Sequence, residues 1–211
     1  ITKLINKKTK AIIFVGLGGS YGNLDKILKI CKKYKLKLIL DAAHMAGAYH
    51  NGKHVGYESD IAVFSFQAVK NLPTADSGMV SFKNKNLENI ARKLSWCGID
   101  KDTFAREKKY KSSQAWEYDV PFLGQKYNGN SLMATVALVA LKYLKKDNIK
   151  RKNIAKIYFD KLKDNKKITI VPHSKGSSRH LFSILVKNRN NIIKRLKEKN
   201  INPGVHYKSI L

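Results

Sequence analysis

Lys70 and Asp41 are the residues whose type and position are best suited to chemistry. Lys70 follows a short apolar run, residues 61–64, whose pattern predicts a buried strand. Asp41 directly follows a second such run, residues 38–40. A lysine just past a buried strand is either a solvated loop lysine or an amine that forms a Schiff base with an aldehyde cofactor. The first alternative has weight, because 36 of the 42 basic residues are lysines.

The pair changes the balance between these alternatives. An acid at one strand end and a lysine after a following strand are the two groups that a pyridoxal phosphate site requires. The acid would keep the pyridine nitrogen protonated, and the amine would hold the aldehyde and later move a proton. The small residues after Asp41 would let a flat ring lie close to the backbone. Taken alone, Asp41 is equally typical of a helix N-cap.

The stretches around both residues resemble one known family. D-A-A-H-M-A-G-A begins at Asp41, and G-x-x-S-D-I-A-V-F-S-F-Q-A-V-K-N-L ends at Leu72. Both are similar to segments of the DegT/DnrJ/EryC1/StrS family, which are pyridoxal-phosphate-dependent aminotransferases acting on nucleotide-linked keto-sugars. The resemblance implies an α/β chain. Its parts would be a three-layer α/β/α PLP-transferase large domain with a mostly parallel sheet, incomplete at the N-terminus, and a smaller α+β C-terminal domain.

The resemblance also implies roles for five residues. Lys70 would carry the cofactor, and Asp41 would face its ring nitrogen. Ala43 would pack against the ring, and His44 would lie near the phenolic oxygen. Ser65 would contact the phosphate. Considered without the family, His44 is also explained as a buried core histidine and Ser65 as a local backbone cap.

Four further residues come from the downstream part of the resemblance. Many relatives have G-Y-N-Y-R where this chain has Gly124 to Asn128, and their asparagine reaches the cofactor phosphate of the neighbouring subunit. Lys126 stands at that place and can serve a phosphate as a cation; Asn128 is the second candidate. A homodimer with shared active sites is therefore expected. His206 and Tyr207 stand where relatives approach the sugar, although as isolated residues they would be ordinary surface groups.

The remaining pattern predicts the order of the elements. The glycines at 16–22 do not form a dinucleotide fingerprint, because Tyr21 stands where the last glycine is needed. Asn23 is predicted to cap a helix whose inner face is Leu24, Ile27, Leu28 and Cys31.

Residues 96–119 resemble the family's substrate-side loop. We expect a large domain at 1–147 and a small one at 148–211. The elements near that boundary are predicted as an apolar helix at 132–144, a bridge beginning at 145–147, a helix at 152–162, strands at 168–171 and 181–186, and a helix at 190–199.

The composition limits the other possibilities. The net charge of +27 suggests nucleic-acid binding. However, only six basic residues are arginines, which base readout favours, and the lysines are spread along the chain. A lysine-rich nucleic-acid-binding protein is thus a remote alternative. Cys31 and Cys97 show no metal-ligand spacing, and no signal peptide or membrane span is visible, so we expect a cytoplasmic protein without a metal site.

The predicted function follows from the resemblance. Glutamate would donate an amino group to a nucleotide-linked keto-sugar, for polysaccharide (such as O-antigen) or deoxysugar biosynthesis. Both ends of the 211-residue chain resemble interior segments of the family, so we expect it to be truncated. The alternative is a non-catalytic fragment or a diverged partner subunit of such an enzyme.

Overall fold

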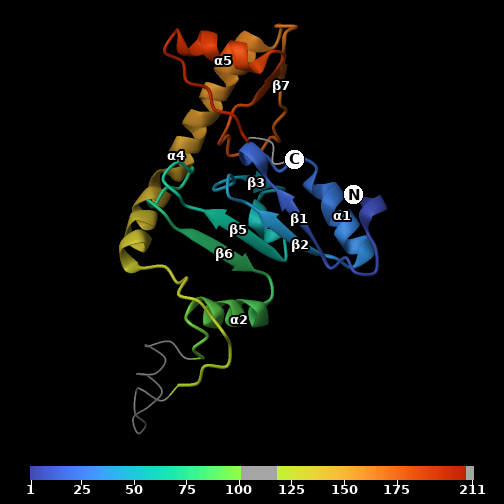
Figure 1. Cartoon of the computed structure of the whole chain (residues 1–211), viewed down its shortest axis with the longest axis vertical. Coiled ribbons are helices and arrows are strands. Elements are labelled where there is room, and N and C mark those ends of the chain that lie inside the picture. Colours follow the sequence, from blue (N-terminus) through green and yellow to red (C-terminus); the bar gives the residue numbers. More distant parts are fainter. Residues whose placement is uncertain (101–117, 208–211) are drawn as a thin grey trace.

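A four-stranded sheet forms the centre of the chain (Figure 1). The structure is a computed structural model and describes residues 1–100 and 118–207. Strands β1, β2 and β5 are parallel neighbours, and β6 pairs antiparallel with β5. The expected, mostly parallel sheet is thus confirmed. Most of the predicted substrate-side loop lies outside the described residues. The strands are β1 (Ala11–Val15), β2 (Lys37–Asp41), β5 (Ile61–Ser65) and β6 (Gly78–Phe82).

Helix α1 (Leu24–Tyr34) connects β1 to its parallel neighbour β2. This strand–helix–strand order is the usual crossover between parallel strands. Its buried face is the predicted one: Leu24, Ile27 and Cys31 pack with Leu38. Asn23 stands at the N-cap, but its side chain makes no capping hydrogen bond.

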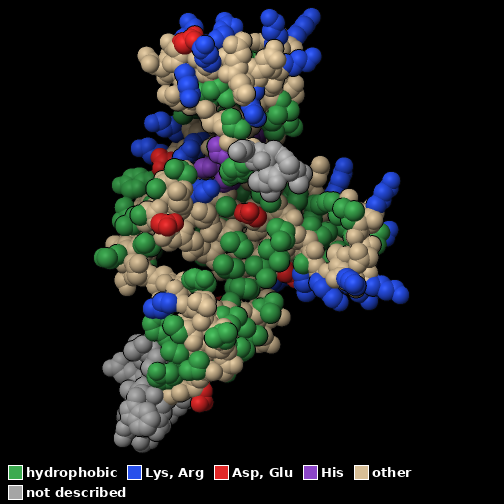
Figure 2. Space-filling view, viewed as in Figure 1, with side chains coloured by type: hydrophobic (Ala, Val, Ile, Leu, Met, Phe, Trp, Pro, Cys, Tyr) green, Lys and Arg blue, Asp and Glu red, His purple; other side chains and the backbone are tan. Residues whose placement is uncertain are grey.

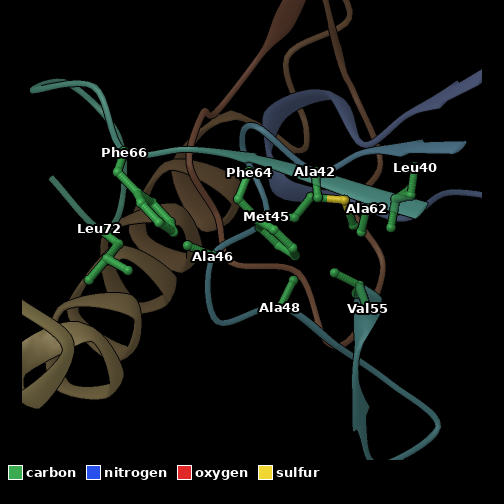
Figure 3. Packing of buried hydrophobic residues seen from close by; sticks show 10 residues of the cluster. All are labelled: Leu40, Ala42, Met45, Ala46, Ala48, Val55, Ala62, Phe64, Phe66 and Leu72. Atoms are coloured by element: carbon green, nitrogen blue, oxygen red, sulfur yellow. The ribbon is translucent and has the colours of Figure 1, made fainter. Parts of the chain in front are cut away.

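The main core lies between the sheet and the turn at residues 42–48. Figure 3 shows Met45 pointing among side chains of β2 and β5, while Phe66 and Leu72 lie beside α4. On the opposite face of the sheet, Ile13 and Val63 remain exposed, and α2 (Lys85–Ser95) packs beside β6. The predicted three-layer architecture has helices on both faces of the sheet. The described chain therefore supplies the layer on one face and, with α2, part of the layer on the other.

A short hairpin and three single helical turns complete the large part. Strands β3 (Tyr49–His50) and β4 (Lys53–His54) are joined by Asn51 and Gly52. Both of these residues have positive φ, the backbone that two-residue hairpin turns favour. The helical turns are η1 (Thr2–Leu4), η2 (Leu17–Gly19) and η3 (Val55–Tyr57).

Helix α4 (Ser131–Leu162) corrects one expectation. The two helices predicted at 132–144 and 152–162 form one continuous helix, and no bridge interrupts it at 145–147. The segment contains no proline or glycine, and lysine is a good helix former, so its charges do not break the helix. The predicted boundary between residues 147 and 148 would fall inside α4, and the division into two domains stays a prediction.

The C-terminal elements gather at the far end of α4 (Figure 1). There β7 (Ile168–Ile170) pairs antiparallel with β8 (Ile184–Val186), and α5 (Arg189–Lys197) follows. These are the predicted strands and helix with slightly shorter bounds. Among the described residues, no helix is both long and apolar enough to cross a membrane.

Candidate active site

The candidate site lies at the carboxyl ends of β2 and β5. Asp41 is the last residue of β2, where Val15 and Val63 are its neighbours in register. One carboxylate oxygen of Asp41, Oδ1, accepts a hydrogen bond from the Ala43 N–H at 3.1 Å. Within residues 1–100 and 118–207, the other oxygen has no hydrogen-bond partner. The carboxylate therefore has one oxygen for its own turn and one for a ligand.

Small residues shape the turn after Asp41. Ala42, Ala46 and Ala48 are buried, and Ala43 is half-buried. Gly47 has a φ of 73°, and a Cβ there would lie 2.5 Å from Nδ2 of Asn148. Glycine is thus required both by the backbone angle and by the close approach of α4. The turn fits the predicted surface for a flat ring.

His44 is buried in this turn as a neutral imidazole. Its Nδ1 accepts a hydrogen bond from the Gly18 N–H at 3.2 Å, so its proton lies on Nε2. The Tyr207 hydroxyl lies 3.5 Å from that Nε2. Burial is the main cause that lowers the pKa of His44; the Lys70 charge lowers it further, while Asp41 opposes both. Asp41 and Lys70 thus both act on His44 through their charges.

Lys70 lies in the loop that follows β5. Its backbone N–H donates to the Gln67 carbonyl at 2.9 Å, which closes a turn, and the next residues, Asn71 and Leu72, are buried anchors. The loop is held further by Thr74, whose hydroxyl donates to the Phe66 carbonyl. In the part of the chain that the structure describes, the Lys70 ammonium has no ion pair or hydrogen bond. The backbone at Lys70 is therefore held in place, while the Lys70 amine remains free to react.

The other predicted site residues are distributed between two places. Ser65 ends β5, and its hydroxyl accepts a 3.4 Å hydrogen bond from the Gln67 N–H, which is the local cap considered as its alternative. His206 lies close enough to lower the pKa of His44, so it joins Tyr207 beside the Lys70 neighbourhood. Lys126 and Asn128 lie elsewhere.

Lys126 and Asn128 are next to the end of α2. The Lys126 ammonium lies 3.7 Å from the centre of the Trp96 ring and donates to Asn128 Oδ1 at 3.0 Å. Neither side chain contacts Asp41 or Lys70 in the described structure. Their predicted role toward a neighbouring subunit stays a prediction.

Sequence reasoning missed a buried polar network beside Lys70. Asn71 donates to Asn148 Oδ1 at 2.8 Å and to the Ser178 carbonyl at 3.0 Å. Asn148 in turn donates to the Ala46 carbonyl at 3.0 Å, and Nδ1 of His180 lies 2.7 Å from Asn71 Oδ1. The available signals were an asparagine directly after the candidate lysine and a histidine not assigned to any motif.

The residues present fit pyridoxal phosphate. The cofactor needs an amine, a carboxylate for its ring nitrogen and a surface of small residues. Lys70 supplies the uncommitted amine, and Asp41 supplies a carboxylate oxygen without a partner among the described residues. Half-buried Ala43 lies on a turn that carries no bulky exposed side chain. A parallel sheet can carry, at the carboxyl ends of its strands, a lysine that binds a cofactor covalently. This is the arrangement of a cofactor-dependent α/β transferase.

The comparisons with known proteins agree with this class. The chain matches the DegT/DnrJ/EryC1/StrS aminotransferase family over residues 1–211 and belongs to that family. The uncharacterized protein MJ1066 of Methanocaldococcus jannaschii is 36% identical over 216 residues, covering 98% of this chain and 55% of that protein. The chain thus spans about half the length of this relative.

Solved structures give the same result. Helicobacter pylori PseC, an aminotransferase involved in the biosynthesis of pseudoaminic acid, has a TM-score of 0.87 at 29% identity, covering 100% of this chain and 56% of PseC. The putative sugar aminotransferase Spr1654 of Streptococcus pneumoniae in its PMP form has a TM-score of 0.86 at 29% identity, covering 97% and 57%. Spr1654 is also known in a PLP form. The family, the fold and pyridoxal phosphate as the family's cofactor are therefore confirmed.

Proposed function

We propose that this chain belongs to a pyridoxal-phosphate-dependent enzyme that moves an amino group from glutamate to a nucleotide-linked keto-sugar. The observation that carries the proposal is that the Lys70 amine and one Asp41 oxygen have no partner among the described residues, and that both charges act on buried His44, in a member of this aminotransferase family. The relatives' sugar-aminotransferase descriptions support the substrate class. Polysaccharide or deoxysugar biosynthesis in the cytoplasm, and a homodimer, belong to the same proposal.

Lys70 and Asp41 have separate tasks in this proposal. When bound, the cofactor supplies an electron-withdrawing ring that stabilises negative charge on the carbon losing its proton. Lys70 would hold the cofactor aldehyde through its amine and, as a free amine, would take and return that proton as a general acid and base. Asp41 holds a proton on the ring nitrogen with the carboxylate oxygen that the turn leaves unpaired.

His44 and Ser65 have supporting tasks. His44 is neutral and bears its proton on Nε2, so it can donate a hydrogen bond to an oxygen of the ligand without adding charge. The Ser65 hydroxyl at the end of β5 can serve a phosphate, since its bond to the Gln67 N–H uses it only as an acceptor. Lys126 and Asn128 would serve the phosphate of a partner subunit, and His206 and Tyr207 the sugar.

The second candidate function is a non-catalytic fragment or a partner subunit of such an enzyme. The chain covers 55% of its relative MJ1066. The two functions differ in whether the residues of this chain are sufficient to transfer the amino group.

A glutamate half-reaction tests the proposal. The chain is mixed with pyridoxal phosphate and glutamate, and the 2-oxoglutarate formed in one turnover is measured. We expect formation that requires the cofactor and is abolished in Lys70→Ala. Lys26→Ala, which removes an exposed lysine of α1, should behave as the unchanged chain. No 2-oxoglutarate above the Lys70→Ala background would contradict the enzyme and favour the partner subunit.

A further inference from the structure

The amide of Asn71 is oriented by its neighbours. Its two N–H groups donate to Asn148 Oδ1 and to the Ser178 carbonyl, and a backbone carbonyl can only accept. Asn148 is oriented in the same way, because its own N–H donates to the Ala46 carbonyl. The Asn71 oxygen must therefore face His180, 2.7 Å from Nδ1.

This arrangement selects one tautomer of His180. Since the Asn71 oxygen can only accept, Nδ1 of His180 carries the proton, and Nε2 offers a lone pair. Nε2 has no hydrogen-bond partner among the described residues, and it is not sealed in the core, where such an atom would be an unsatisfied buried group. Figure 2 shows histidine side chains at the surface, where the sheet meets the C-terminal elements.

The surroundings keep His180 neutral. Burial, followed by the charges of His44, Lys70, Arg151 and His206, lowers the pKa of His180 to about 4. The His44 ring lies 4.4 Å away between centroids and has the opposite tautomer, with its proton on Nε2. At neutral pH, His180 Nε2 is thus a hydrogen-bond acceptor, and the neighbouring His44 ring carries a donor at its own Nε2.

We propose that His180 is a substrate-positioning residue, whose Nε2 accepts a hydrogen bond from a hydroxyl of the sugar bound beside Lys70, and that Asn71 and Asn148 hold it in the tautomer that this requires. The class of ligand rests on the proposed function. A hydroxyl both donates and accepts, so it can use the acceptor of His180 Nε2 together with the donor of the neighbouring His44 Nε2.

The first test is the tautomer itself, which needs neither cofactor nor activity. In a long-range ¹⁵N–¹H spectrum of the chain, His180 should show a protonated Nδ1 and an unprotonated Nε2 throughout pH 6–9, a range above the pKa of about 4. A proton on Nε2, or titration near the ordinary value of 6.5, overturns the inference.

The second test uses two variants that each keep one half of the imidazole. In His180→Asn, the amide N–H can replace Nδ1 and keep the bond to Asn71, but nothing replaces Nε2. In His180→Gln, the amide oxygen reaches the place of Nε2, but the Asn71 oxygen loses its donor. The probe is UDP-N-acetylglucosamine, a stable nucleotide sugar with free hydroxyls.

We expect the two variants to separate stability from binding. His180→Asn should keep the unfolding midpoint and weaken probe binding about five- to tenfold, the loss of one hydrogen bond. His180→Gln should lower the midpoint and keep most of the affinity. In the unchanged chain, the probe should shift the Nε2 resonance of His180. An Nε2 resonance that does not shift when the probe is added, or equal affinity in all three proteins, overturns the inference.

The failure of the proposed function would look different. If Lys70 does not react with pyridoxal phosphate, while the tautomer and the probe-induced shift are observed, only the proposed function fails.

Discussion

Lys70 and Asp41 gain their suitability for chemistry from what their neighbours leave unbonded. The turn after β2 uses one Asp41 oxygen for the Ala43 N–H, and the loop after β5 fixes the Lys70 backbone while its ammonium has no partner among the described residues. A lysine on a solvated face would also have a free ammonium, but its charge would not act on a buried histidine as that of Lys70 acts on His44.

Asp41→Asn separates the electrostatic task of this residue from its structural one. The amide oxygen can still accept from the Ala43 N–H, so the turn should persist. The amide cannot hold a proton on the ring nitrogen as a carboxylate does. We expect pyridoxal phosphate still to attach to Lys70, with 2-oxoglutarate formation roughly hundredfold slower, the scale of one lost electrostatic partner. Formation at the unchanged rate would contradict the role assigned to Asp41.

Ala75 is a strained residue in the loop between β5 and β6 that carries Lys70 (residues 66–77, here called the lysine loop). It has a φ of 79°, which disfavours any residue with a Cβ. Ala75→Gly should therefore raise the unfolding free energy by about 0.5–1 kcal/mol, the relief of strain less the entropy cost of glycine. Ala68→Gly, in the same loop without positive φ, is the control and should lower it. Both changes can be measured by urea unfolding.

At the scale of elements, α4 links the lysine loop to the C-terminal part. Its buried Asn148 bonds to Asn71 in the lysine loop and to Ala46 in the turn after β2. Through Asn71, the same network reaches Ser178 and His180 in the segment before β8. The positions of three separate segments around Lys70 thus depend on one helix residue.

Asn148→Ala should be strongly destabilising. It would leave a buried N–H of Asn71 and the Ala46 carbonyl without partners, at about 1–3 kcal/mol each, so we expect a loss of roughly 2–4 kcal/mol in unfolding free energy. Asn153→Ala, at an exposed position of the same helix, should stay within about 0.5 kcal/mol. Equal effects in the two variants would show that the network does not hold the elements together.

The sequence predicted what is local and missed what depends on the path of the chain. Asp41 ends one strand pattern and Lys70 closely follows another, and both patterns can be recognised within a few residues. Asn71 meets Asn148 and His180 across 77 and 109 residues, and no short-range pattern contains those contacts. The predicted break in α4 was wrong because a cluster of charges was taken as a helix end, although charged residues suit an exposed helix.

At the scale of the whole molecule, His50 joins α1 to the region around the hairpin. It is buried and contacts the carboxylates of Asp25 in α1 and Glu58 after η3. Burial by itself would lower the pKa of His50, but the hydrogen bonds to Glu58 and Asp25 outweigh it and raise that pKa above 6.5. Protonated His50 therefore stabilises the folded chain.

The pH dependence follows from this sign. Because the folded-state pKa is the higher one, the contribution is fully present below about pH 6.5 and is lost as the pH rises through the folded-state value. We expect the difference in unfolding free energy between the unchanged chain and His50→Gln to shrink over that interval. The change should be roughly 0.5–1 kcal/mol, since Asp25 is 66% exposed and its attraction is screened. A difference that grows with pH would contradict the assignment.

The central claim is that Lys70 is the attachment point of the cofactor, and peptide mapping after borohydride reduction tests it most directly. With 36 lysines in the chain, pyridoxal phosphate at high concentration will label many of them, so the labelling is done at equimolar cofactor. We predict that the reduced cofactor is found on the peptide containing Lys70, and that Lys70→Ala removes this label without increasing it elsewhere. Labels spread over surface lysines, and unchanged by Lys70→Ala, would contradict the account.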